Sequence, residues 1–384
     1  MTKFDSININ NENYNNNFTS NENNSLSVIN YNIPNITKLI FDIKKNDTDH
    51  YYFKYYKTLS TTEKSVTYLF IKIFNNAYYL NNDDYIIISD VNIINYTNIE
   101  NQKSIIIKKI KKSNGLNELD IYKYINKMNN TSTTINQSAN NNNNNILQCY
   151  GWIDTPKINK NEVYLLLEYC QYGNLKEFLH KYMSDNNIEA KYLHSNQSYI
   201  KLIDNIIIQI LNGMVLLEKM NIVHNDIKIE NIFVKYNDHI NIKIGDFDLS
   251  WIKTNKIIIG GTPYYVSPEI IYKIDKPKQN GENNIIYQND TFKLIDQNST
   301  YYKVDVWAFG VLYIYLYSQS YPFYAKYRET LFKKIKNNKY KIRYKNLQKF
   351  IESHNIFTKD IDKRPTLLEL QNQIIKKTNK VNAG

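Results

Sequence analysis

The sequence predicts an α+β fold in which a β-rich first part is followed by a helix-rich second part. Between about residues 36 and 169, apolar residues occur in short runs that alternate with polar ones, a pattern typical of half-buried strands. From residue 175 onward, apolar residues recur every three or four positions over longer segments, as they do along one face of a helix. A length of 384 residues is enough for one large two-lobed domain with a tail.

The first part begins with residues that have little to bury. Residues 1–35 are dominated by Asn, Ser and Thr, and we expect a disordered Asn-rich tail there. Residues 36–83 alternate apolar and polar groups, which indicates short strands, but these strands match no known element, so we treat the segment as an extension whose structure the sequence leaves unassigned. The segment from 84 to 170 predicts five strands and one helix, with the strands at 85–88, 93–96, 104–110, 146–152 and 163–169 and the helix at 116–128.

The second part is mainly helical. Two polar stretches, near 129–145 and near 275–299, are interpreted as low-complexity insertions. Residues 378–384 are interpreted as a short tail. Apolar periodicity predicts helices at 175–183, 200–220, 304–317, 331–336, 347–353 and 367–377.

Composition points away from several classes of protein. The net charge of +11 would suit an anionic partner, but Asn, Lys, Ile and Tyr are all over-used and share A/T-rich codons, so we expect no nucleic-acid partner. Cys149 and Cys170 are too few for a disulfide framework or a zinc site. The polar N-terminus does not resemble a secretory signal, and no apolar run is long enough for a membrane span. We therefore expect a soluble protein of the cytoplasm, with the nucleus as the open alternative.

One segment carries most of the chemical information. Lys228 and Asn231 follow Asp226 by two and five residues, and Asp246 comes fifteen positions after Asn231. This order places a proton-accepting carboxylate, a cation, an amide oxygen and a second carboxylate in two short loops. Phosphoryl transfer from a nucleotide needs such a set, because a carboxylate orients the attacking hydroxyl, a cation balances the moving phosphoryl group and oxygen atoms hold Mg²⁺.

The pattern resembles the catalytic loop and the metal-binding loop of the protein kinase family. The resemblance extends over about 84–377. It implies a two-lobed protein kinase fold, with a small, mostly β N-lobe at 84–170 and a larger, mostly α C-lobe at 171–377. It also implies ATP and Mg²⁺ as cofactors and a protein hydroxyl as the phosphoryl acceptor.

The same resemblance implies a role for each residue of the two loops. Asp226 would be the catalytic base, and Lys228 would contact the γ-phosphate. Asn231 and Asp246 would ligate Mg²⁺. A lysine two residues after the base favours Ser/Thr over Tyr substrates.

A phosphate-anchoring lysine is expected on a strand before the first predicted helix. The run Ile-Ile-Ile-Lys ending at Lys108 resembles the Val-Ala-Ile-Lys strand of the family. Lys108 would neutralise the α- and β-phosphates and would be held by Glu118, ten residues later. Lys72 is a rival for this role, but no helix carrying a glutamate follows it closely, so we favour Lys108.

The adenine site is expected at the end of the last strand of the small lobe. Residues 163–170 resemble the strand and connector that bind adenine through backbone groups. Leu167 would be the gatekeeper. Glu168 and Cys170 would supply the backbone hydrogen bonds.

A peptide-binding platform separates protein kinases from small-molecule kinases that share the catalytic loop. Residues 261–269 resemble the Gly-Thr-x-x-Tyr-x-x-Pro-Glu segment of Ser/Thr kinases. Thr262 would bridge Asp226 and Lys228. Glu269 would form a buried ion pair with Arg364. Asp305, in a predicted helix, would brace the catalytic loop.

Three departures from the family pattern support a second hypothesis, a pseudokinase that acts as a scaffold or allosteric binding module. Asn225 stands where the family has Arg, and Asp248 stands where it has Gly. A glycine-rich loop is missing from residues 89–95, where we expect it, since the first glycine of the chain is Gly115. Without the arginine no phosphate-reading clamp can form, so we expect the activation segment to fold without phosphorylation. The sequence assigns no oligomeric state.

Overall fold

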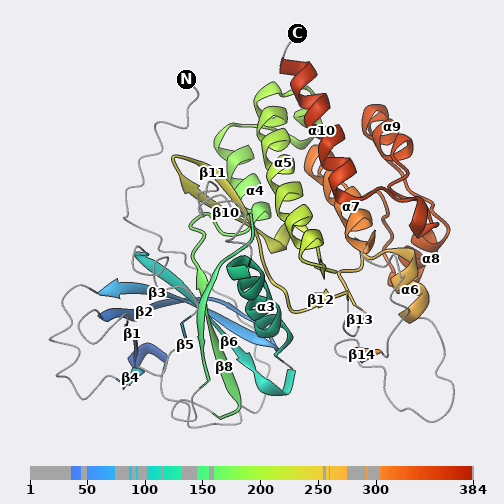
Figure 1. Cartoon of the computed structure of the whole chain (residues 1–384). Coiled ribbons are helices and arrows are strands. Elements are labelled where there is room, and N and C mark those ends of the chain that lie inside the picture. Colours follow the sequence, from blue (N-terminus) through green and yellow to red (C-terminus); the bar gives the residue numbers. More distant parts are fainter. Residues whose placement is uncertain are drawn as a thin grey trace, which may run out of the picture. The chain divides into compact units, whose positions relative to one another are not determined.

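The computed structural model describes two lobes joined by one connecting segment (Figure 1). All of the described residues fall within the unit Pro34–Gly384. The structure describes residues 36–44, 50–73, 86–88, 92–93, 102–114, 116–131, 145–154, 160–253, 257–258, 260–274, 291–292 and 303–382.

The first lobe is built on one curled sheet. Among the described residues its eight strands follow the order β4-β1-β2-β3-β6-β8-β7-β5, and neighbours are antiparallel except for the parallel pair β1–β4. The strands are β1 (Leu39–Lys44), β2 (His50–Thr61), β3 (Ser65–Ile73), β4 (Ile86–Ile88), β5 (Asn92–Ile93), β6 (Ser104–Lys111), β7 (Cys149–Ile153) and β8 (Glu162–Glu168).

The segment that the sequence left as an extension supplies three strands of this sheet. β2 and β3 form a long hairpin, and β3 pairs directly with β6, with Thr67 opposite Lys108. The short strands β4 and β5, by contrast, lie at the two edges of the sheet. The small lobe therefore begins upstream of residue 84, where the sequence placed its start. Alternating Tyr, Phe and Ile residues predicted strands in 36–83, but pairing partners are non-local and no motif identified them.

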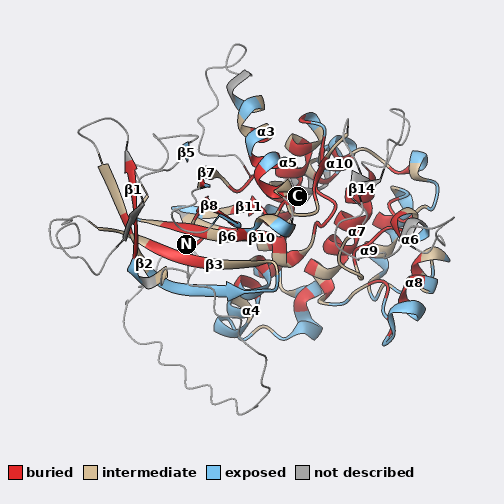
Figure 2. Cartoon of the chain, turned by 90° about the horizontal axis from the view of Figure 1, so that it is seen from below, coloured by how far each residue is buried: buried red, intermediate tan, exposed pale blue. Residues whose placement is uncertain are grey.

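The two faces of the sheet are covered differently because side chains alternate along each strand. On β6, Ile105 and Ile107 point into an aromatic-rich core with Phe41, Phe53 and Phe70. The neighbouring positions of β6, among them Ile106 and Ile110, face helix α3 (Asn117–Thr131) and join the core that continues into the second lobe. Figure 2 shows buried residues along the middle of β3 and β6, at the centre of the sheet. Lys108 shares the parity of Ile106 and is thus directed toward α3.

The second lobe is helical, as predicted. α7 is almost entirely buried and forms its centre, and its neighbour α5 buries one long face (Figure 2). Asn174 and Asn196 begin α4 and α5 by accepting hydrogen bonds from Glu177 N and Tyr199 N. The helices are α4 (Leu175–Asp185), α5 (Gln197–Lys219), α6 (Pro268–Ile274), α7 (Val304–Ser318), α8 (Arg328–Lys336), α9 (Lys345–Ser353) and α10 (Leu367–Asn382).

Helix α10 continues five residues beyond the predicted end at 377, into the segment interpreted as a tail. Most of both predicted insertions, and all of residues 1–35, lie outside the described residues. Among the described residues one helix, α5, is long and apolar enough to cross a membrane, although the sequence showed no candidate span. Of its most apolar window, 56% is buried inside the protein, as expected for a core helix.

Candidate active site

The catalytic loop is held at both ends by short strands. It begins after β9 (Ile222–Val223), which pairs with β12 (Trp251–Ile252), and ends at β10 (Ile232–Asn237), which pairs with β11 (His239–Ile244). The Gly245 amide donates to the Asn231 carbonyl at 3.0 Å. This bond places the end of the catalytic loop beside Asp246, fifteen positions further along the chain.

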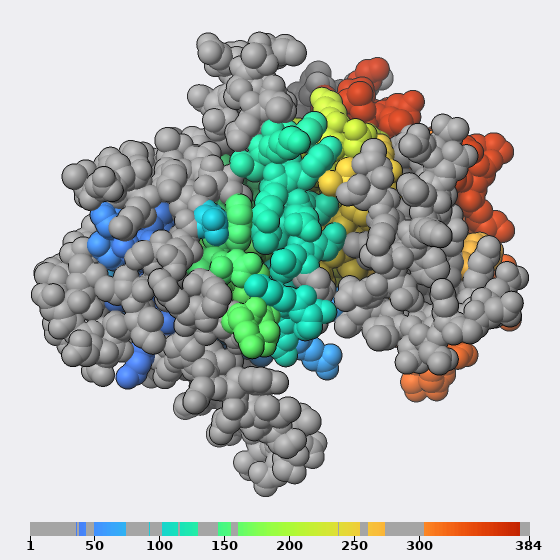
Figure 3. Space-filling model, turned by 60° about the horizontal axis from the view of Figure 1, so that its bottom comes forward, coloured from blue at the N-terminus to red at the C-terminus, as the bar shows by residue number. Residues whose placement is uncertain are grey.

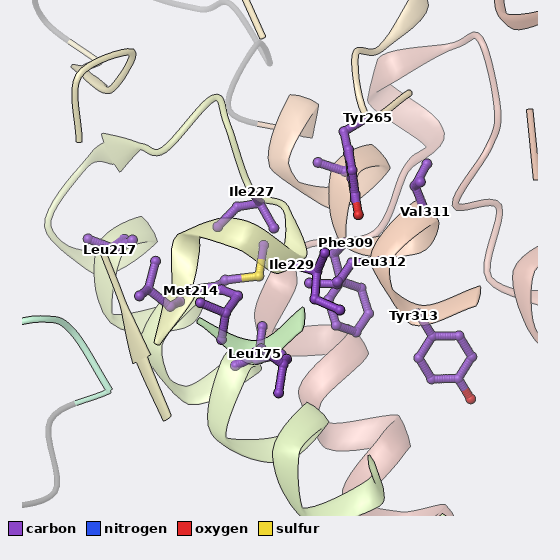
Figure 4. Packing of buried hydrophobic residues seen from close by; sticks show 14 of the residues in the cluster. Leu175, Met214, Leu217, Ile227, Ile229, Tyr265, Phe309, Val311, Leu312 and Tyr313 are labelled. Atoms are coloured by element: carbon purple, nitrogen blue, oxygen red, sulfur yellow. The ribbon is translucent and has the colours of Figure 1, made fainter. Parts of the chain in front are cut away.

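The catalytic loop contains both apolar residues that are buried in the core and polar residues that line a cavity. Ile227 and Ile229 are fully buried, and they lie among Met214 of α5 and Phe309 of α7 (Figure 4). Asp226, Lys228 and Asn231 instead line a large cavity. Burial of the two isoleucines therefore directs Lys228, which lies between them, away from the core and toward the cavity.

The Asp226 carboxylate is the centre of a hydrogen-bond network. Lys228 Nζ donates to Asp226 Oδ2 at 2.5 Å and to Thr262 Oγ1 at 3.0 Å. Thr262 donates to Asp226 Oδ1 from its hydroxyl at 2.8 Å and from its backbone N–H at 3.0 Å. Asn231 Nδ2 donates to Asp226 Oδ2 at 3.0 Å. Thr262 thus connects Asp226 and Lys228, the arrangement expected from the sequence, and the carboxylate is held in one orientation.

Lys108 connects the two lobes. Its Nζ lies 2.7 Å from Glu118 Oε2 on α3 and 2.9 Å from Asp246 Oδ1. Lys72, the rival candidate, lies on β3 with its Nζ 4.2 Å from the centroid of the Tyr51 ring. The lysine that reaches the predicted metal-binding loop is therefore Lys108.

Burial and charge shift the pKa values of this cluster. Burial alone would lower the pKa of Lys108, but the attraction of Asp246 and Glu118 raises it well above its usual value, so the amine stays protonated. The charge of Lys108 lowers the pKa of Asp246 to about 2. Burial raises the pKa of Glu118 to about 7 despite the opposing effect of Lys108. At neutral pH the cleft thus holds a fixed cation beside an ionised Asp246.

Asp305 of α7 braces the backbone of the catalytic loop. Its carboxylate accepts from His224 N at 2.7 Å and from Asn225 N at 2.8 Å. Burial raises the pKa of Asp305 to about 7, although both backbone hydrogen bonds act to lower it. Asn225 has φ of 64°, a left-handed conformation that Asn adopts more easily than most residues. The side chain that replaces the expected arginine donates to Leu249 O at 3.1 Å.

Asp248 adopts ordinary backbone angles. It lies outside the positive-φ region, whereas Asp246 has φ of 66°. The loop therefore forms without a glycine at position 248. The Asp248 carboxylate lies 2.8 Å from Lys64 Nζ.

Helix α3 is hydrogen-bonded to this loop by Asn117, a residue that sequence analysis did not identify. Asn117 Nδ2 donates to the carbonyls of Asp248 at 2.9 Å and Ser250 at 2.7 Å. In the space-filling view α3 (teal) lies between the small-lobe strands and the segment near residue 250 (yellow), and it contacts β12 (Figure 3). Asn117 precedes Glu118, so one turn of helix positions both the ion pair and the loop.

A cavity of about 1470 Å³ collects most of the predicted site residues. At the expected adenine end of the cavity, the Glu168 carboxylate lies 2.8 Å from Lys235 Nζ and the Glu168 N–H donates to Gln148 O at 2.9 Å, so neither group is directed at a nucleotide. At the other end the cavity reaches Tyr264 and Tyr321, beyond Thr262. The lining includes Lys108, Glu118, Leu167, Glu168, Cys170, Asp226, Lys228, Asn231, Asp246 and Thr262.

The remaining three predicted residues support the site from within the second lobe. Arg364 forms a bidentate pair with Glu269, at 2.6 Å and 2.8 Å, and its guanidinium carbon lies 5.0 Å from the Trp307 ring centroid. Arg364 is 2% exposed. This ion pair anchors α6, the helix that follows the platform, and Asp305 acts as described above.

The chemistry of the donor set fits a nucleotide-bound Mg²⁺. Mg²⁺ is held by one or two protein oxygen ligands together with substrate phosphates and water. Asp246 is ionised, and Asn231 commits its amide nitrogen to Asp226, which leaves its amide oxygen as the acceptor. Among the described residues no group of three or more His, Cys, Asp or Glu side chains is placed to hold a metal.

The structure also corrects the place of the expected glycine-rich loop. The strand before β6 in the sheet is β3, so the hairpin above the cleft is the β2–β3 hairpin and not residues 89–95. Its tip, residues 61–65, lines the cavity through Thr62, Glu63, Lys64 and Ser65. Sequence reasoning missed this hairpin because it contains no glycine.

The class of protein is defined by two features. A mostly β lobe is followed by a mostly α lobe, and the cavity brings together Lys108, Asp226 and Asp246. The family model for the protein kinase domain matches residues 90–379. The chain belongs to the protein kinase family. The match begins after the β2–β3 hairpin, so the hairpin is assigned to the small lobe by the structure alone.

Relatives are Ser/Thr kinases. Serine/threonine-protein kinase plk-2 of Caenorhabditis elegans is 32% identical over 188 residues, 48% of this chain and 23% of that protein. The cell cycle serine/threonine-protein kinase CDC5/MSD2 of Saccharomyces cerevisiae is 27% identical over 180 residues, 46% of this chain and 20% of that protein. The Aurora kinase of Eremothecium gossypii is 30% identical over 193 residues, 50% of this chain and 41% of that protein. The chain therefore matches less than half the length of each of these relatives.

Proposed function

We propose that this chain is an active Ser/Thr-type protein kinase that transfers the γ-phosphoryl group of Mg²⁺-ATP to a protein hydroxyl. The observation that carries the proposal is the convergence of Lys108, Asp226, Asn231 and Asp246 on one cavity. These residues come from both lobes, and no local sequence constraint would bring them together.

Each side chain has a defined task in this reaction. Asp226 accepts the proton of the attacking hydroxyl. Lys228 keeps the carboxylate oriented, because its Nζ donates to Asp226 Oδ2 at 2.5 Å. Lys108 is positioned to neutralise phosphate charge, while Asn231 and Asp246 would hold Mg²⁺. Bound Mg²⁺ would neutralise charge that develops on the phosphates. The polypeptide acceptor would lie along the part of the cavity formed by Thr262 and Tyr264.

The test compares the wild-type chain with Asp226→Asn in Mg²⁺-ATP binding and in transfer to a generic basic protein. We expect the substitution to lower the transfer rate by roughly 10²- to 10⁴-fold, the usual contribution of a general base, with the Kd for Mg²⁺-ATP nearly unchanged. Asp185→Asn, at the exposed end of α4, is the matched control. Equal transfer by wild type and Asp226→Asn would contradict the assignment of the base.

The alternative is a pseudokinase that serves as a binding module. Three observations favour it: a hairpin without glycine above the cleft, Asp248 and Asn225. Nucleotide binding by the wild-type chain without transfer would support a nucleotide-dependent scaffold. A wild-type chain that neither binds nor transfers would indicate a scaffold that functions without nucleotide.

A further inference from the structure

The hairpin above the cleft is closed by its own hydrogen bonds. Thr62 N donates to Ser65 O at 2.9 Å, and Ser65 N donates to Thr62 Oγ1 at 3.0 Å. Within residues 61–65, all of which are described, no residue has positive φ, so the turn needs no glycine. Two backbone N–H groups of the tip are therefore committed to the turn and are not directed at a ligand.

The same tip places a cation inside the cavity. Lys64 lines the cavity together with Lys108 and Asp246. Its Nζ lies 2.8 Å from Oδ2 of Asp248, two residues after Asp246 in the sequence. The two side chains are 30% and 34% exposed, so a ligand in the cavity has access to both.

We infer that Lys64 is a phosphate-binding residue of the nucleotide site, in which a lysine side chain replaces the backbone N–H donors of a glycine-rich loop. The inference rests on the proposed nucleotide binding. An ammonium group is an effective phosphate ligand because it supplies a full charge and rotatable donors. In the absence of phosphate the lysine is held over the cleft by Asp248, and a nucleotide phosphate competes for the same ammonium.

The tip also carries a carboxylate, Glu63, which lines the cavity beside Lys64. The ion pair with Asp248 distinguishes the two side chains, because it shows that Lys64 reaches across the cleft to the loop of Asp246. Lys64 therefore carries the attraction for phosphate.

The experiment measures the Kd of ATP, ADP and adenosine, each with Mg²⁺, by calorimetry for wild type and Lys64→Met. We expect Lys64→Met to weaken ATP and ADP binding by roughly tenfold or more, as for a lost charge-assisted hydrogen bond, and to leave adenosine binding unchanged. Lys64→Arg should retain most of the affinity. Lys111→Met removes the same charge from an exposed residue at the end of β6, outside the residues that line the cavity, and it should change the Kd for ATP little.

A second background separates phosphate binding from a structural role of the ion pair. If Lys64 acts only by holding the hairpin to Asp248, Lys64→Met will have no further effect on ATP binding in Asp248→Asn. If it binds phosphate, Lys64→Met weakens ATP binding in both backgrounds. Unchanged ATP binding by Lys64→Met, or an equal loss of adenosine and ATP, would overturn the inference. A wild-type chain that binds no nucleotide would instead overturn the proposed function.

Discussion

Asp305 shows how a single buried carboxylate organises the catalytic loop. It receives the N–H groups of His224 and Asn225, and Asn225 has a left-handed backbone. A non-glycine residue in that conformation costs roughly 1–2 kcal/mol. The two hydrogen bonds offset part of this cost and favour the ionised carboxylate, but burial penalises that charged form more strongly, so the protonation state of Asp305 affects the free energy of unfolding.

The raised pKa of Asp305 predicts a pH-dependent stability. Burial raises the pKa of Asp305 from its usual 3.8 to about 7, so the folded chain binds a proton here more tightly than the unfolded chain does. The resulting contribution to the free energy of unfolding is complete below about pH 4 and is lost as the pH rises through about 7. In Asp305→Asn this contribution no longer titrates. Between pH 5 and 7 the free energy of unfolding of wild type should fall relative to the variant by on the order of 1.4 kcal/mol per unit.

Urea unfolding of both chains at several pH values measures this difference. Glu118, whose pKa is also raised, is present in both chains and cancels in the comparison. Asp185→Asn, which removes an exposed carboxylate, is the control and should show no such trend. A constant difference between wild type and Asp305→Asn across the range would contradict the prediction.

The buried ion pair between Glu269 and Arg364 predicts that a conservative substitution will lower the free energy of unfolding strongly. Glu269→Gln leaves the Arg364 guanidinium buried without its counter-charge, and breaking a buried pair in this way costs about 3–5 kcal/mol. Lys363→Gln removes the neighbouring exposed cation, which pairs with Asp360 at the surface, and should cost less than about 1 kcal/mol. Chemical denaturation measures both values, and similar costs for the two variants would show that the buried pair has no special weight.

At the scale of elements, the first part of the activation segment, which follows β11, is bound directly to the catalytic loop. Asn225 Nδ2 binds Leu249 O, and Ser250 Oγ donates to His224 O at 3.0 Å. Ser250, Tyr265 and Ser267 are buried, so their hydroxyls are closed to a modifying enzyme. The segment is therefore held to the catalytic loop by neutral hydrogen bonds of ordinary length, at the position where the family pattern has an arginine that would read a phosphate.

This arrangement predicts activity without phosphorylation of the segment. The double variant Thr254→Ala, Tyr264→Phe removes the hydroxyls outside Thr262 and the buried residues, and its transfer rate should remain within tenfold of wild type, a difference below about 1.4 kcal/mol. Asn225→Ala, which loses the hydrogen bond and strains the backbone, should lower activity more. A larger loss in the double variant than in Asn225→Ala would refute the hypothesis.

At the scale of the whole molecule, the small lobe depends on strands that lie upstream of the family match. Phe41, Phe53 and Phe70 are fully buried in the core on one face of the sheet. Each contributes about 2 kcal/mol by burial, so the three together are comparable with a net stability of 5–15 kcal/mol. Removing β1, β2 and β3 would also leave β6 as an unpaired edge strand of the sheet.

Truncation tests this dependence. A chain of residues 34–384 should unfold cooperatively and keep the nucleotide affinity of the full chain, whereas residues 84–384 should show no cooperative unfolding. Circular dichroism during heating and calorimetry with Mg²⁺-ATP provide the two measurements. A folded, nucleotide-binding chain of 84–384 would show that β1, β2 and β3 are dispensable.

The sequence by itself located the two loops that carry Asp226, Lys228, Asn231 and Asp246, and the segment 261–269 that is predicted to bind the peptide. Asp226, Lys228 and Asn231 lie within six residues of one another, and chemistry requires those residue types at those spacings. Most helix positions were also predictable, because helical periodicity is local: α7 was expected at 304–317 and runs from Val304 to Ser318, whereas the short helix α6 was not predicted.

Only the tertiary structure decided which strands surround Lys108 and which hairpin lies above the cleft. Strand pairing joins residues far apart in sequence, and alternation shows that a strand exists without showing its partner. Residues 36–83 therefore remained unassigned until β3 was seen beside β6, and Lys64 could not be connected to Asp248, 184 positions away. The physical reason is that helices and loops are specified by near neighbours, while a sheet and the cleft beneath it are specified by contacts between distant parts of the chain.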